Sequence, residues 1–118
     1  QALLWLAACR TYRFVAEFAV QVVRERYLSD RFDLPLEGFY IFWDEKAQSN
    51  PELNDISTPT RLKLRHGMFR MMREASIITA DGTIQTAYLT PEVRALIEQS
   101  QPSELLFFPG IQVEGDVV

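Results

Sequence analysis

The sequence predicts a mainly α-helical fold: a helical bundle that carries a winged-helix-like unit with a small two-stranded β-hairpin. Long segments without Gly or Pro hold apolar residues at helical spacing, which favours helices. An Asn or Thr precedes Pro at three points where helices would begin, and one Asp-Gly pair lies between β-prone residues. The 118 residues, 47% of them apolar, suffice for one hydrophobic core, so we expect a single domain over residues 1–118.

The N-terminal part, residues 1–56, is expected to form the helical bundle. Residues Thr11 to Leu28 contain neither Gly nor Pro and predict its first long helix. Apolar residues cover most of this helix, so it should be buried on most sides. The preceding segment, Ala2 to Arg10, either continues the helix or forms a separate turn. The polar side chains of the long helix fall on one narrow stripe, which consists of Arg13, Glu17, Gln21 and Arg24.

A second helix of the bundle is predicted from Leu36 to Ala47. Its aromatic residues recur at positions i, i+3 and i+4, so one face should pack inward. Asn50-Pro51 then supplies an N-cap and a first-turn proline, which predict a short helix ending near Asp55. The inward aromatic residues are Phe39, Phe42 and Trp43.

Residues 57–100 are expected to contain a long basic helix, the hairpin and a short helix. Thr58-Pro59 gives the signal for a long helix from Thr60 to Ala75. Asp81-Gly82 is a strong turn signal, so a β-hairpin should run from Ile77 to Leu89. Thr90-Pro91 begins a helix that ends near Gln99.

Residues 101–118 carry two Pro and two Gly and predict an extended tail. Within this tail, Leu105 to Phe108 is apolar enough to dock on the body of the domain.

The long helix is the only basic segment of an acidic chain. Residues 57–76 hold five basic groups and one acidic group, whereas the whole chain has a net charge of −4. On a helical projection, Lys63, His66, Arg70 and Arg73 share one face, and an apolar half lies opposite. Arg61 and Arg65 lie on the apolar side near its border with solvent, where they can snorkel or pair with a carboxylate.

A basic helix followed by a hairpin is the element order of a winged helix–turn–helix, in which the last helix meets a DNA duplex. We expect Lys63, Arg70 and Arg73 to contact phosphates, and four such contacts would give a log–log salt slope of roughly −3.6. The alternative interpretation is a solvated face that neutralises nearby carboxylates, and the acid at the hairpin tip, Asp81, favours it. The residues expected to assist are Thr58, Thr60, Arg61 and His66.

The residues give little support for catalysis. His66 is the only histidine, which excludes a multi-histidine metal site, and Cys9 has no second cysteine to pair with. The glycines are dispersed, so there is no phosphate-binding loop, and we expect neither a cofactor nor a bound metal. The apolar run from Ala2 to Val23 contains three charges, which disfavours a membrane span. The single cysteine fits the reducing cytoplasm.

The chain resembles the BrxA family of the BREX phage-exclusion systems. The segments that carry the resemblance extend over nearly the whole chain, and the block from Thr60 to Ala75 is the most specific of them. The others include Tyr12-Arg13-Phe14-Val15-Ala16-Glu17-Phe18-Ala19-Val20, Arg24-Glu25-Arg26-Tyr27-Leu28, Phe42-Trp43, Pro51-Glu52-Leu53, Leu89-Thr90-Pro91 and Phe107-Phe108-Pro109.

The resemblance is to the C-terminal portion of the family's proteins. It implies a cytoplasmic helical protein of antiviral defence, not an enzyme, that binds double-stranded DNA without sequence preference beside other phage-defence subunits. The alternative function is that of a protein-interaction subunit of the defence complex that makes no direct DNA contact.

Overall fold

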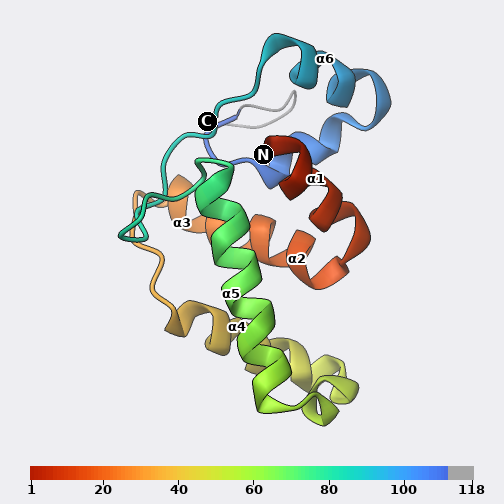
Figure 1. Cartoon of the computed structure of the whole chain (residues 1–118), viewed down its shortest axis with the longest axis vertical. Coiled ribbons are helices and arrows are strands. Elements are labelled where there is room, and N and C mark those ends of the chain that lie inside the picture. The colour runs from red at the N-terminus through yellow and green to blue at the C-terminus, as the bar shows by residue number, and fades with distance from the viewer. Residues whose placement is uncertain (112–118) are drawn as a thin grey trace.

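The computed structural model describes residues 1–111 and confirms a mainly helical fold. The longest helix, α5, runs along the molecule in front of the other helices, with α6 at the upper end and η2 at the lower end (Figure 1). The elements in chain order are α1 (Ala2–Thr11), α2 (Arg13–Phe18), the π-helix η1 (Ala19–Arg24), α3 (Glu25–Leu28), α4 (Glu37–Ser49), the 3₁₀-helix η2 (Pro51–Asp55), α5 (Thr58–Glu74), α6 (Pro91–Ser100) and the 3₁₀-helix η3 (Pro102–Phe107).

The helix predicted from Thr11 to Leu28 forms, but it starts later and changes its winding. Tyr12 has extended backbone angles (φ −120°, ψ 113°), which make α1 a separate helix. A π-turn holds more residues than an α-turn, so the later side chains of η1 are rotated relative to those of a continuous α-helix. Arg24, expected on the polar stripe, is for this reason buried, and its Nη1 donates to the carbonyl oxygen of Ile111 at 3.4 Å.

Aromatic rings from α2, α4 and α5 meet in the centre of the core. Phe18 is fully buried, and its ring centroid lies 5.6 Å from that of Phe42 and 6.4 Å from that of Phe69. Phe39 is also fully buried, and Trp43 is 2% exposed. The prediction that the three aromatic residues of α4 pack inward is confirmed.

The helix starts predicted from the Thr-Pro pairs lie within two residues of the observed starts of α5 and α6. The Oγ1 of Thr90 accepts a hydrogen bond from the Val93 amide at 3.3 Å, so α6 begins as predicted. Helix α5 begins two residues early because Ser57 is its N-cap, with Oγ accepting from the Thr60 amide at 3.3 Å. Asn50 does not cap η2; its Nδ2 donates to the Lys46 carbonyl oxygen and closes α4 instead.

The predicted two-stranded hairpin is wrong, because residues 1–111 contain no strand longer than an isolated bridge. Ile78 and Ile84 form one antiparallel bridge around the Asp81-Gly82 turn. The Gln85 amide still donates to the Ile77 carbonyl oxygen, but beyond Gln85 the return segment leaves its expected partner, since the Ala87 amide donates to the Pro109 carbonyl oxygen. Ile77 and Ile78 are both buried, so this segment lacks the alternation of a half-exposed strand. The winged-helix part of the fold prediction is therefore not supported.

The C-terminal segment packs against α1 instead of forming an extended tail. Residues 102–107 form η3, and Leu105 and Phe108 are buried, which confirms the predicted docking. Trp5 Nε1 donates to the Phe107 carbonyl oxygen at 2.9 Å. Residues 112–118 of the predicted tail lie outside the described residues.

Candidate nucleic-acid interface

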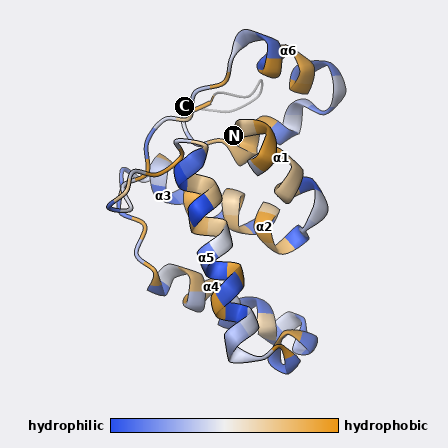
Figure 2. Ribbon diagram, in the orientation of Figure 1, coloured by the Kyte–Doolittle hydropathy of each residue, from blue (hydrophilic) through white to orange (hydrophobic). Residues whose placement is uncertain are grey.

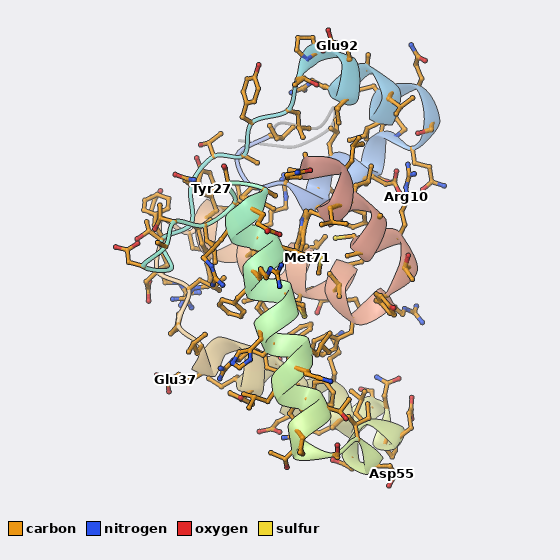
Figure 3. The ribbon with its side chains drawn as sticks, in the orientation of Figure 1. Arg10, Tyr27, Glu37, Asp55, Met71 and Glu92 are labelled. Carbon is orange, nitrogen blue, oxygen red and sulfur yellow. The ribbon has the colours of Figure 1, made fainter. Side chains whose placement is uncertain are left out.

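Helix α5 has one face in the core and one in solvent. Met68 and Met72 are fully buried, and Phe69 is 4% exposed and contacts Phe18 across the core. Figure 2 shows hydrophilic residues interspersed with apolar ones along this helix, and Met71 marks its C-terminal part in Figure 3. The predicted amphipathic character is confirmed, and it directs the basic residues of the opposite face outward.

The outward face carries four residues that we call the outer row: Lys63, His66, Arg70 and Arg73. All four are exposed. Their spacing of three, four and three residues keeps them on one side of the helix over about 15 Å. The structure thus brings together the three predicted phosphate contacts and His66 in one line.

Two of the three cations in the outer row are free of carboxylates. Within residues 1–111, Lys63 and Arg73 form no ion pair. Arg70 Nε lies 3.8 Å from the Glu74 carboxylate, and both side chains are largely exposed, so this pair is weak. The alternative interpretation, in which carboxylates neutralise the basic face of α5, therefore applies to Arg70 at most.

His66 contacts its neighbour in the chain, Arg65. Arg65 Nη2 lies 2.8 Å from His66 Nε2. A guanidinium only donates hydrogen bonds, so Nε2 accepts in this contact. His66 can still donate one hydrogen bond from Nδ1 to a phosphate oxygen.

Arg61 and Arg65 lie away from the outer row, against α4. The Arg61 guanidinium carbon is 5.2 Å from the ring centre of Trp43. Arg65 lies 5.7 Å from the Tyr40 ring centre and donates to the Tyr40 hydroxyl at 3.0 Å. Arg61 is about 160° around the helix from Lys63, so one flat duplex surface does not reach both. The two arginines hold α5 to α4 through cation–π contacts, whereas ion pairs with carboxylates do not form in the described part of the chain.

The N-terminus of α5 offers fewer donors than predicted. The amide of Thr60 already donates to Ser57, and its hydroxyl accepts from Ser57 Oγ at 2.9 Å. Pro59 has no amide hydrogen, and the Arg61 amide donates to the Ser57 carbonyl oxygen. Thr58 is exposed and is the first residue of α5, three residues after Asp55, which Figure 3 labels at the lower end of the molecule. Of the two threonines, only Thr58 keeps its amide available for a phosphate.

The Asp81-Gly82 turn presents a negative charge. The Asp81 carboxylate accepts hydrogen bonds from the hydroxyls of Thr79 and Thr83. These bonds lower the pKa of Asp81 below its ordinary value, with Thr79 the larger cause. The carboxylate is ionised at neutral pH and repels a phosphate, so this turn is a poor substitute for the basic tip of a wing.

Among residues 1–111, no group of three or more His, Cys, Asp or Glu side chains is placed to hold a metal ion. Cys9 is 3% exposed beneath the contact between α1 and η3. Arg10 reaches the buried Glu104 there with two hydrogen bonds of 2.8 and 2.7 Å (Figure 3). Sequence spacing gives no signal for this pair, because 94 residues separate its members.

We expect Cys9 to resist thiol reagents in the native protein. Burial, with a smaller contribution from the nearby Glu104 carboxylate, raises the pKa of its thiol to about 12. At pH 8 the reactive thiolate is then on the order of 1000-fold scarcer than in a thiol with the ordinary pKa. Labelling with a chromogenic disulfide, with and without denaturant, measures this difference. Equal rates in the two conditions would show that Cys9 is accessible.

Comparison with known proteins identifies one relationship. The family model BrxA matches residues 1–101. A search of the curated proteins found no match, and a search of the solved structures found none either. Among the helices of residues 1–111, none has both the length and the apolar run that a bilayer crossing requires.

Proposed function

Because the chain belongs to the BrxA family, and is thus a component of a BREX phage-defence system, we propose that it is a non-catalytic cytoplasmic protein that binds double-stranded DNA. The outer row of α5 is the proposed contact surface. Lys63, Arg70 and Arg73 contact phosphates, and His66 and Thr58 add hydrogen bonds. Thr60 and Arg61 act indirectly, by capping α5 and by holding it to α4.

One observation carries this proposal: an exposed line of cations without strong carboxylate partners, in a chain whose net charge is −4. Lone cations on an acidic surface usually pair with nearby acids, yet Lys63 and Arg73 do not within residues 1–111. A duplex carries one negative charge per roughly 1.7 Å of axis, so a line of about 15 Å faces several phosphates.

Binding through the outer row gives affinity without much sequence preference. Lysine and arginine contacts to phosphates position a protein on a duplex, whereas contacts to base edges read the sequence. The acidic surface away from α5 repels DNA, which confines the duplex to this one helix face. Within residues 1–111 the turn at Asp81 supplies no second basic element, so the proposed mode is helix contact without a wing.

A mobility-shift titration across salt concentrations tests the proposal. Three phosphate contacts predict that the logarithm of the association constant falls with the logarithm of salt with a slope of about −2.7. Duplexes of unrelated sequence should give the same slope. A slope near zero, or no shift of any duplex at low salt, would reject DNA binding by the outer row.

The second candidate is a protein-interaction subunit of the defence complex that makes no DNA contact. The acidic segments on both sides of α5 favour it, because they offer docking surfaces to basic partners. Co-purification with other defence subunits that survives nuclease treatment, together with no shift of free duplex, would support this function over the first.

A further inference from the structure

A groove lies between the long N-terminal helical segment and α4, away from the proposed DNA contact. It has a volume of about 420 Å³. Val22 of the π-helix η1 and Phe42 of α4 line its apolar part, and Ile41 projects there with 58% of its surface exposed. In Figure 3 the labelled Tyr27 and Glu37 mark the ends of the two helical segments that border it. Two nearly adjacent helices thus form an apolar site that solvent reaches.

Carboxylates border this groove from both helices. Glu25 and Glu45 are exposed lining residues, and neither forms an ion pair within residues 1–111. Arg26 also lines the groove, but it is engaged with Asp33 at 2.9 Å. Arg31 is the one lining cation of the described residues without an ion pair. The uncommitted charge at the rim is therefore net negative, and it complements a basic partner.

The groove and the outer row face different directions. Trp43 of α4 contacts Arg61 of α5. Ile41 and Glu45 each lie two residues from Trp43, which places them about 160° around α4 from that contact. A partner seated in the groove therefore does not collide with a duplex bound to α5.

We propose that this groove binds an amphipathic helix of another subunit of the defence system. An aliphatic or aromatic side chain of that helix inserts beside Ile41, and its Lys or Arg residues form ion pairs with Glu25 and Glu45. An apolar floor with charged rims is the arrangement that holds a partner's helix by its anchor residues. The chain then joins a protein partner on one side to DNA on the other. This inference rests on family membership and not on DNA binding.

Peptide binding to the full chain tests the groove directly. The probes are two labelled helical peptides with one row of Leu, flanked by Lys in the first and by Glu in the second. Fluorescence anisotropy should show binding of the Lys peptide alone. Ile41→Glu should weaken it at least 10-fold, although the added carboxylate attracts a basic peptide. Leu96→Glu is the matched control, because Leu96 is 57% exposed on α6, and it should bind as the wild type does.

Charge reversal provides the second arm. The double variant Glu25→Lys with Glu45→Lys should weaken binding of the Lys peptide. The control, Glu52→Lys with Glu92→Lys, makes the same charge change away from the groove and should have a much smaller effect on this binding. In cells that express the remaining defence subunits, the Ile41→Glu variant should no longer co-purify with its partner subunit, whereas the Leu96→Glu variant should still do so. Duplex binding by Ile41→Glu should equal that of the wild type.

Three results would overturn the groove proposal. The first is equal peptide binding by Ile41→Glu and Leu96→Glu. The second is co-purification that survives Ile41→Glu and both charge reversals. The third is a wild-type dimer in light scattering that Ile41→Glu converts to a monomer, because the occupant would then be a second copy. A loss of duplex binding in all variants, the wild type included, would reject the DNA proposal and leave the groove unaffected.

Discussion

Replacing Phe18 by Ala is expected to lower the free energy of unfolding by about 3–5 kcal/mol. The Phe18 side chain has no exposed surface, and its ring contacts the rings of Phe39, Phe42 and Phe69. Deleting it removes a ring of α2 that packs against both α4 and α5 and leaves a cavity in the core, although Phe14 of α2 still contacts α4. A domain of this size has only about 5–15 kcal/mol of stability, so the variant should be close to unfolding at room temperature.

Urea unfolding followed by circular dichroism measures this loss. Phe32→Ala is the matched control, because Phe32 is 42% exposed and contacts only the Tyr27 ring, at 5.4 Å, among the aromatic residues described. It should cost about 1 kcal/mol or less. Similar losses for the two variants would mean that Phe18 does not occupy the centre of the core.

The positions of the helices could be predicted because their signals are local. Thr90-Pro91 fixes the start of α6 through one hydrogen bond within three residues. The two faces of α5 follow from periodicity alone, since Met68 and Met72 are fully buried and Lys63 and Arg73 are exposed. The candidate interface depends on this one periodic pattern, which is why its main residues were accessible from the sequence.

The features that could not be predicted depend on contacts distant in the sequence. The predicted return strand to Leu89 does not form, because beyond Gln85 the Ala87 amide donates to the Pro109 carbonyl oxygen, a partner that no local pattern reveals. Arg24 turns inward because η1 adds residues to a turn, and apolar periodicity does not anticipate that change. The sequence predicts that Arg61 assists at the DNA surface, whereas in the structure its guanidinium packs against the ring of Trp43 on α4, away from the outer row.

Reversing two charges of the outer row should nearly abolish DNA binding. At 0.1 M salt each phosphate contact contributes roughly 10^0.9 in affinity through counterion release, so losing two costs about 60-fold. Lys63→Glu with Arg73→Glu should lose more than this, because each new carboxylate also repels a phosphate. Anisotropy of a labelled duplex at several salt concentrations measures the loss, and the salt slope should fall from about −2.7 toward −0.9.

The same charge change elsewhere separates contact from general repulsion. Arg13 and Arg31 are exposed, and each lines a groove that also holds carboxylates, so they are poor phosphate ligands. Arg13→Glu with Arg31→Glu also makes the chain more negative by four charges, yet it should keep most of the wild-type affinity and the full salt slope. The Lys63 and Arg73 variant should unfold at the wild-type urea concentration, because both side chains are exposed and have no ion pair in residues 1–111. Equal losses in the two double variants would show that the duplex senses only net charge and that the outer row is not its contact surface.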